Sequence, residues 1–300
     1  MAVGLEGAPA AEAQELAQPP APPRSRLLDP RLLVTALITV ILVVGYWQYH
    51  ILEIRSLAVA LLAAVATETV LSRALRGRFA NVQSAYISGV SMALLTKPQG
   101  PLLWPFAIGS ALAILSKYVL TRRGRHLWNP TNFAISALVL LAPGSVAILS
   151  HEMGNSLATN LVIWAMGLLI VSRVRLLHVT LTYAACFAAL APLRAALAGV
   201  PVLAEIAPIT GPMYQLFVFF MITAPRTTVG TRRGRMAVAA AVAVVEFAIR
   251  LANDFHLGFA APLASAPPIF ALAIVGPIAM WLDLGRRPVV SLKTGAPGVR

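Results

Sequence analysis

The 300-residue chain is 58% hydrophobic and only 12% charged, and its mean hydropathy is +0.78. Soluble domains are typically about a quarter charged, so this composition predicts an integral membrane protein. The formal net charge of +13 comes from short arginine clusters between apolar runs, not from a basic stripe with interleaved aromatic residues, which argues against nucleic-acid binding. The single cysteine, Cys186, excludes an internal disulfide and a self-contained iron–sulfur cluster.

Residues 1–30 are dominated by Ala, Pro, Glu and Gln and are too poor in apolar residues to fold, so we expect a disordered cytosolic tail. They are not a signal peptide, because the apolar run from Leu32 is long enough to span and no small-x-small cleavage site follows it. A second cytosolic tail is expected at residues 286–300. The membrane domain between them, residues 31–285, contains ten apolar segments: 32–48, 55–72, 82–96, 102–120, 130–143, 156–172, 175–193, 211–223, 236–252 and 264–284.

The third, fifth and eighth segments hold only about 13 to 15 residues, fewer than the ~20 that a straight transmembrane helix needs. Such segments are stable in a membrane only where protein or a water-filled cavity surrounds their ends. We therefore expect them to be half-helices or broken helices. The predicted fold class is an all-α integral membrane protein with about ten transmembrane segments.

The basic residues predict the orientation of these segments. If the N-terminus is cytosolic, every large arginine cluster falls in a cytosolic loop, as positive-inside sorting requires. This pattern predicts an even number of spans, both termini in the cytosol, and a multi-pass protein of a bacterial-type plasma membrane. The clusters are Arg24/Arg26/Arg31, Arg73/Arg76/Arg78, Arg122/Arg123/Arg125, Arg173/Arg175, Arg226/Arg232/Arg233/Arg235 and Arg286/Arg287.

A Thr-x-Pro motif ends two of the short segments. Thr96-Lys97-Pro98 ends the third and Thr223-Ala224-Pro225 ends the eighth, and the two threonines lie 127 residues apart. Ten segments divide into two sets of five, and an odd repeat length gives the two sets opposite orientations. We therefore predict an inverted repeat, with halves of about 31–143 and 155–285. The repeated motif points to a binding site near the midplane between these halves, with Thr96 toward the outer face and Thr223 toward the inner one.

Three charged residues lie inside the apolar segments: Glu68, Lys117 and Glu246. Ionisable groups within a membrane are costly, and they usually pair with each other or face a cavity. Two pairings are open, Lys117 with Glu246 or Lys117 with Glu68, and either has a structural or a functional interpretation. Lys117 also lies close enough to the cytosolic end of its segment to extend its ammonium group to the interface.

Asn129-Pro130-Thr131 opens the short fifth segment. Asn is a favourable N-cap and Pro a favourable first helical residue, so we expect a helix to start there. The free N–H groups of a helix start form a natural anion site, where a flavin phosphate or an anionic head group would bind. The alternative is an ordinary capped helix.

Three further motifs carry a resemblance to a known family. Segment 116–130 begins with Ser116-Lys117, keeps a glycine at position 124 and ends in Trp128-Asn129-Pro130. Segment 219–225, Phe-Phe-Met-Ile-Thr-Ala-Pro, is followed by Gly234-Arg235, and Ile249-Arg250 lies in the next segment. In this order the motifs resemble those of the NqrB/RnfD family, the membrane subunits of the sodium-pumping quinone reductase and the Rnf complex. The chain is similar to compact members of that family associated with secondary-metabolite clusters, including enediyne biosynthesis.

The resemblance implies flavin-associated transmembrane electron transport within a larger complex, with FMN or riboflavin as the cofactor. The family attaches FMN to a threonine, which Thr159 matches here. Leu157, in place of the family's glycine, argues against that attachment because Leu cannot adopt the backbone conformations open to Gly. Ala224 and Leu257 replace family carboxylates, and without those oxygen ligands sodium coupling is not expected.

The expected cofactor-binding residues are therefore Thr159, Asn129, Thr131, Thr96, Thr223 and Lys117. The expected partners are other membrane subunits, the lipid bilayer, and a flavin or quinone. Two other functions stay open: a small-molecule channel or transporter on the same scaffold, and an assembly subunit without chemistry of its own. The chain has no complete catalytic constellation. No metal site is predicted, because the histidines fall at loops or helix ends, where we expect them to be solvated or interfacial: His50, His126, His151, His178 and His256.

Overall fold

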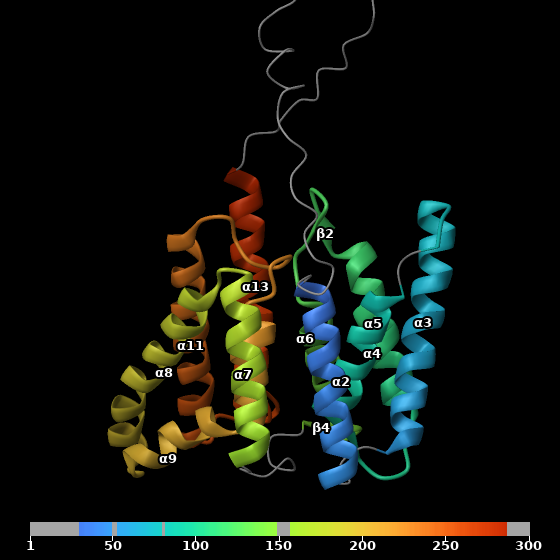
Figure 1. Cartoon of the computed structure of the whole chain (residues 1–300). Helices are drawn as coiled ribbons and strands as arrows, with labels where there is room; N and C mark the ends of the chain where they lie inside the picture. The colour runs from blue at the N-terminus through green and yellow to red at the C-terminus, as the bar shows by residue number, and fades with distance from the viewer. Residues whose placement is uncertain (1–29, 50–52, 80–81, 149–156, 287–300) are drawn as a thin grey trace, which may run out of the picture.

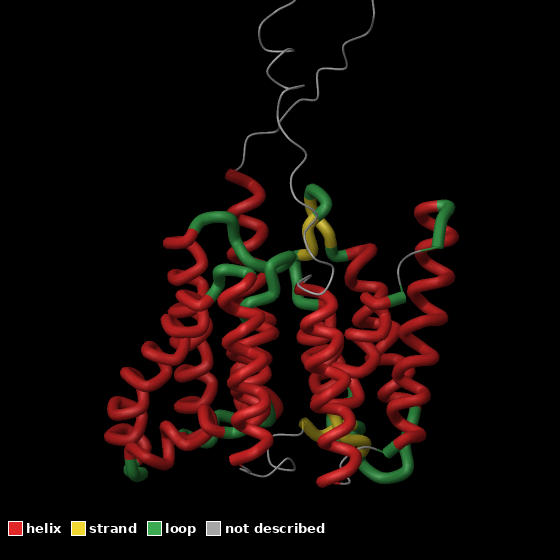
Figure 2. The backbone as a smooth tube through the Cα atoms, viewed as in Figure 1, coloured by secondary structure: helices red, strands yellow, loops and turns green. Residues whose placement is uncertain are grey.

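The computed structural model describes residues 30–49, 53–79, 82–148 and 157–286. Within these ranges the chain is mainly helical, and most of the helices run up and down one bundle (Figures 1 and 2). Helix is present in each of the ten apolar segments expected from the sequence. The predicted all-α class is therefore confirmed, whereas the tails at residues 1–30 and 286–300 lie, apart from their inner ends, outside the described residues.

Four of the described helices are long and apolar enough to cross a membrane: α3 (Ile54–Arg76), α8 (Leu177–Ala198), α11 (Arg232–Asp254) and α13 (Pro267–Arg286). A fifth crossing results if Val202–Thr210 and Pro212–Met221, which are bent by 62° at a short break, form one broken span. These helices indicate a membrane-embedded protein. The full count of ten spans stays a prediction.

The first half of the chain forms one group of helices. Helix α3 packs along both α4 and α5, and α5 packs along α6. Strands β1 and β4 pair antiparallel with Thr96 opposite Ile148, and β2 and β3 form a hairpin with Thr121 opposite His126. The elements are α2 (Pro30–Tyr49), α3, α4 (Gln83–Leu95), β1 (Thr96–Pro98), α5 (Trp104–Val119), β2 (Thr121–Arg122), β3 (Arg125–His126), α6 (Pro130–Leu141) and β4 (Val146–Ile148).

The described part of the second half is helical and contains no strand. Helix α8 packs along α11, and α11 packs along α13. The eighth apolar segment is broken into short pieces and ends in a single π-helical turn, η3. The elements are α7 (Leu157–Arg173), α8, α9 (Val202–Ile206), η2 (Ala207–Thr210), α10 (Pro212–Leu216), η3 (Phe217–Met221), α11, η4 (Gly258–Ala260), α12 (Ala261–Ala264) and α13.

The two halves share one apolar core. Helix α2 contacts α7, and α6 contacts α13, so the middle of the bundle is built from both halves. Side chains from each half are completely or almost completely buried in one continuous cluster, among them Leu37, Phe106, Ile163, Phe217 and Phe270. This shared core indicates that the halves pack as one body.

The short helices are short in the structure as well. Helix α4 has 13 residues and α6 has 12. At about 1.5 Å of rise per residue, α6 is about 18 Å long, well short of the ~30 Å hydrocarbon core of a bilayer. The prediction that these segments are short or broken is confirmed for α4 and α6, and the helix of the eighth segment starts at a break, where Val202–Thr210 and Pro212–Met221 are bent by 62°.

The arginine clusters of the described residues gather at one end of the bundle. This end, at the top of Figure 1, contains the C-terminal ends of α3, α7 and α13, the start of α11, and the β2–β3 hairpin. Lys97, Glu205 and Asp254 lie at the opposite end, on or beside β1, α9 and the last residue of α11. We call these the arginine end and the opposite end. Which side of the membrane each end faces stays a prediction.

Candidate functional site

Both threonines of the repeated motif are buried, and both make the same local hydrogen bond. The Thr96 hydroxyl donates to the carbonyl of Met92 at 2.6 Å, and the Thr223 hydroxyl donates to the carbonyl of Phe219. In each case the acceptor is four residues earlier, in the last turn of the helix, and the Met92 carbonyl also accepts the backbone N–H of Thr96. Each Thr-x-Pro therefore ends its helix by the same device.

The two threonines do not belong to one site. Thr96 begins β1 and lies at the opposite end, whereas Thr223 precedes the loop that contacts the β2–β3 hairpin at the arginine end. Lys117 and Asn129 also lie toward the arginine end. The expected cofactor-binding residues are thus divided between the two ends, and the two Thr-x-Pro motifs are not brought together in one site between the halves. Thr159 lies within α7, and its side chain is outside the described part of the structure.

The start of α6 is capped as expected. The Asn129 side chain accepts a hydrogen bond from the backbone N–H of Asn132 at 3.3 Å, and Pro130 occupies the first turn. The Trp128 indole donates to the carbonyl of Ala273 at 2.9 Å, and the Asn132 amide donates to the carbonyl of Ile269 at 2.8 Å. These bonds fix the start of α6 against α13. Thr131 is buried in the same turn.

The segment around Trp128 and the loop after Thr223 meet at the arginine end. Arg125 donates to the carbonyls of Pro225 and Thr228, at 2.8 and 2.7 Å. Leu127 and Val229 are buried in one small apolar cluster with Met280 and Leu284 of α13. We call this meeting point the motif junction, and define it by residues 125–132, 223–235 and the facing turns of α13.

Gly234 and Arg235 stabilise the second side of the motif junction. The Gly234 N–H donates to the Thr231 hydroxyl, which caps α11, and a Cβ on Gly234 would lie only 2.7 Å from that oxygen. The Arg235 side chain donates to the carbonyl of Val229 at 2.8 Å. A glycine followed by an arginine is therefore what this helix start requires.

Two buried polar atoms at the motif junction have no hydrogen-bond partner among the described residues: Nδ1 of His126 and Oδ1 of Asn132. Burial, with a smaller contribution from the neighbouring Arg226, lowers the pKa of His126 to about 4, so the ring is neutral near pH 7. His126, which we expected to be solvated or interfacial, is half-buried in the hairpin, and its Nδ1 is enclosed by the fold. An unsatisfied buried polar atom costs about 1–3 kcal/mol, so a ligand that bonds to these atoms would be stabilised there.

Lys117 is paired with Glu68, one of the two alternatives left by the sequence. Its ammonium group donates to the Ser84 carbonyl at 3.0 Å and to the Ser84 hydroxyl at 2.9 Å, and lies 4.0 Å from Oε2 of Glu68. The Tyr118 hydroxyl donates to the other Glu68 oxygen at 2.6 Å. Both charged side chains are buried, so Lys117 neither pairs with Glu246 nor extends into solvent.

Glu246 is the centre of a second buried network. It is fully buried and accepts hydrogen bonds from the hydroxyls of Tyr183 and Tyr214, the latter at 2.6 Å. Arg250, one helical turn further on, donates from Nε to Glu246 at 3.0 Å and from Nη2 to the Tyr214 hydroxyl. Two tyrosines and one guanidinium therefore surround this carboxylate.

Arg194 extends the network toward the opposite end. It binds both oxygens of Asp254, at 2.8 and 3.0 Å, and also donates to Glu205. The sequence alone did not identify Arg194, Glu205 or Asp254 as functional. The four-residue spacing of Glu246 and Arg250 was the available signal, because residues at i and i+4 face the same side of a helix. The Glu246 network is defined here as Tyr183, Arg194, Glu205, Tyr214, Glu246, Arg250 and Asp254.

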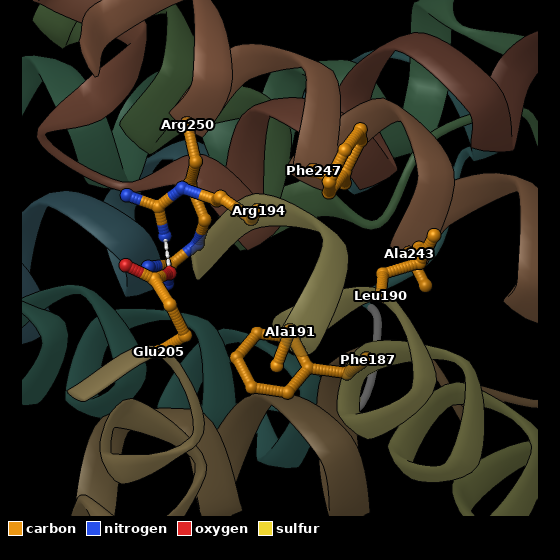
Figure 3. Close-up of a pocket in the computed structure, with 8 residues that line it drawn as sticks. All are labelled: Phe187, Leu190, Ala191, Arg194, Glu205, Ala243, Phe247 and Arg250. Atoms are coloured by element: carbon orange, nitrogen blue, oxygen red, sulfur yellow. Dashed lines mark hydrogen bonds and ion pairs between the residues drawn. The ribbon is translucent and has the colours of Figure 1, made fainter. Parts of the chain in front are cut away.

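A small pocket adjoins the Glu246 network. Arg194, Glu205 and Arg250 lie on one side of it, and Phe187, Leu190, Ala191, Ala243 and Phe247 complete its lining (Figure 3). The Arg250 guanidinium lies 5.5 Å from the centre of the Phe187 ring, within the range of a cation–π contact. The pocket has room for about one water molecule.

Among the described residues, no group of three or more His, Cys, Asp and Glu side chains is placed to hold a metal ion. Comparison of the chain with protein-family models and with curated proteins finds no match to either.

Proposed function

We propose that the chain is a membrane subunit for flavin-associated electron transfer within a larger complex, as its resemblance to the NqrB/RnfD family implies. The observation that supports this proposal is the motif junction. Segments 125–132 and 223–235 are about a hundred residues apart in the sequence, yet they bond to each other through Arg125 and pack together on α13. Motifs of separate segments that converge in this way are typical of a shared site.

The motif junction offers chemistry that suits a flavin. Its unpartnered buried atoms, on His126 and Asn132, can each bond to the ring N–H or to the ribityl hydroxyls of FMN or riboflavin. Asn129 and Thr131 would hold such a ligand at the start of α6, with Thr223 and Lys117 in neighbouring positions. A bound flavin supplies one- and two-electron redox chemistry, and the residues of this chain bind and orient it. Thr96, at the opposite end, would not take part.

The inverted repeat is part of the same proposal, and the helix contacts support it. The packing of α3 on α5 corresponds to that of α8 on α11, and the packing of α5 on α6 corresponds to that of α11 on α13. Two of the contacts between the halves, α2 with α7 and α6 with α13, each join elements that are equivalent in the repeat. Contacts between equivalent elements are what a two-fold axis in the membrane plane produces. With the arginine end in the cytosol, this arrangement describes a multi-pass protein of a bacterial-type plasma membrane.

The proposal is tested by the cofactor content of the purified protein. The full chain is co-expressed with a flavin transferase, and flavin is measured by fluorescence after heat release and, for covalent attachment, in a denaturing gel. We expect flavin that heat releases, and a several-fold loss of it in the Asn132→Leu variant, which removes a partner of the ligand. Thr182→Ala is the control, because its hydroxyl bonds only within its own helix. The absence of both released and covalent flavin in wild-type protein would contradict the proposal.

A transporter for a small molecule is the second candidate function. It is favoured by the bend of 62° in the broken eighth segment and by the short helices α4 and α6, since interrupted helices line the substrate sites of transporters built from inverted repeats. Flux of a panel of solutes into proteoliposomes tests it. Flux that is lost in bulky variants such as Thr96→Phe and Thr223→Phe would favour transport, and no flux for any solute would count against it.

A further inference from the structure

The charges of the Glu246 network do not balance. Three carboxylates, on Glu205, Glu246 and Asp254, face two guanidinium groups, on Arg194 and Arg250. Helix α11, which carries Glu246, packs mainly against α8 and α13, while α9 and α10 supply Glu205 and Tyr214. The hydroxyls of Tyr183 and Tyr214 are the other titratable groups of the network. The remaining charged residues of α8, α11 and α13, among them Asp283 and Arg286 of α13, lie in the turns nearest the arginine end. With every acid and base ionised, the network therefore carries one uncompensated negative charge.

An uncompensated charge in this position is expensive. Ionised groups within a membrane protein are stable only when they are paired or hydrated, and the penalty for removing one from water is several kcal/mol. Glu246 lies within the helix bundle and is almost completely buried, whereas Glu205 and Asp254 lie toward the opposite end. One additional positive charge would remove the penalty, and a proton is the smallest group that supplies it.

Glu246 is the carboxylate best placed to hold that proton. Asp254 makes a two-point contact with Arg194, its side chain is 22% exposed, and Glu205 shares the same arginine. The Glu246 side chain is only 1% exposed, and the one guanidinium that contacts it also donates to Tyr214. The hydroxyls of Tyr183 and Tyr214 can donate to a carboxylate or accept from a carboxylic acid, so both forms of Glu246 have hydrogen-bond partners.

A pocket adjoins the Glu246 network, and Arg250, which donates to Glu246, is one of the residues that line it. It is lined by Arg194, Glu205 and Arg250, and it lies between the ends of α8 and α11 that are farther from the arginine clusters (Figure 3). The space suits about one water molecule, which is enough to pass a proton between bulk water and the network.

We propose that the Glu246 network is a proton-binding site, in which the Glu246 carboxylate takes up one proton from the water at the opposite end of the bundle. The proton converts the carboxylate to a carboxylic acid, and no other bond is made or broken. The network is neutral when the site is occupied and has a charge of minus one when it is empty. The site is independent of the motif junction and of any flavin bound there.

Infrared difference spectroscopy of the full-length protein in liposomes tests this proposal, because it detects the C=O stretch of a protonated carboxylic acid directly. We expect one such band to grow as the pH is lowered, and to shift when glutamate but not aspartate is labelled with carbon-13. The band should be absent from Glu246→Gln and retained in Glu68→Gln, a matched change in the charge-balanced Lys117 pair. No pH-dependent carboxylic acid band, or a band that shifts with labelled aspartate, would overturn the assignment.

Two further measurements test the charge balance itself and do not require Glu246→Gln to fold. Asp254→Asn removes the excess negative charge, so the band should appear only at lower pH than in wild-type protein. Tyr183→Phe should keep the band but move its frequency, because one hydrogen bond to the carboxyl group is lost. A midpoint that is unchanged in Asp254→Asn, or a titration that depends on sodium concentration, would show that a proton does not balance the network.

Discussion

The buried pair of Lys117 and Glu68 should show strong energetic coupling. The two charges are 4.0 Å apart, and their side chains are 9% and 8% exposed. At an effective dielectric constant of about 20, charges at this separation attract each other by about 4 kcal/mol. Removal of one member of a buried pair typically costs about 3–5 kcal/mol, because the other charge remains buried without a partner.

A double-mutant cycle measures this coupling. We expect Lys117→Met and Glu68→Gln each to lower the free energy of unfolding in micelles by about 3 kcal/mol. The double variant should lose far less than the sum, with a coupling energy of about 3 kcal/mol, because it leaves no buried charge unpaired. Steric trapping or a detergent unfolding titration gives the four free energies.

The matched control is Arg55→Gln, which removes an exposed charge from the same helix as Glu68. It should change stability by less than about 0.5 kcal/mol and should be additive with Lys117→Met. If the losses of Lys117→Met and Glu68→Gln simply add in the double variant, the two charges do not interact and the reasoning is refuted.

Three other predictions concern helix ends, packing and pH. Thr96→Val and Thr223→Val should each lower the free energy of unfolding by about 1 kcal/mol, because the hydroxyl-to-carbonyl hydrogen bond is lost. Ser at either position should retain most of that stability, and equal losses for Val and Ser in thermal unfolding would contradict this explanation. Gly109→Ala should lower the free energy of unfolding by about 1–3 kcal/mol, because the added Cβ would lie 2.5 Å from Cε of Met92. Gly285→Ala has open space around the added Cβ and should be nearly neutral. Similar melting temperatures for the two variants would disprove the close contact at Gly109. His126 has a folded pKa of about 4, below the ~6.5 of the unfolded chain, so the unfolded chain binds the proton first and stability falls as the pH drops from about 6.5 to 4. Since the ring is partly hydrated, we expect this loss of stability to be about 1 kcal/mol, measured as the free energy of unfolding of the wild type minus that of His126→Gln. If the wild type instead gained stability relative to the variant as the pH drops over this range, the predicted sign would be wrong.

Much of the helical architecture follows from the sequence, because apolar runs bounded by polar residues must form helices in a membrane. Run length was enough to predict that α4 and α6 are short, and the residue types at Asn129-Pro130 were enough to predict the cap of α6. These features depend on local chemistry alone. The two short strand pairs were not predicted, because the partners of β1 and β4 are about 50 residues apart and have no pattern of their own.

The choice of partners could not be predicted in the same way. The positions of Glu68, Lys117 and Glu246 within apolar segments indicated that they are buried, but not which charge each one contacts. That choice depends on the packing of α3 against α5 and on the side chains that the bent eighth segment brings to α11. Tyr214 is an example, because its hydroxyl reaches Glu246 from α10 only as a result of that bend.

The β2–β3 hairpin limits how the two halves can move. It belongs to the first half of the chain, yet Arg123 and Arg125 bind carbonyl groups of the second half, and Arg122 also stacks on Trp281 at 3.7 Å. Because the hydrogen-bond acceptors are main-chain groups, substitutions in the second half leave those attachments in place. The hairpin therefore holds the two halves together at the arginine end. Any displacement of one half relative to the other would be smallest there and largest at the end where Arg194 and Asp254 lie.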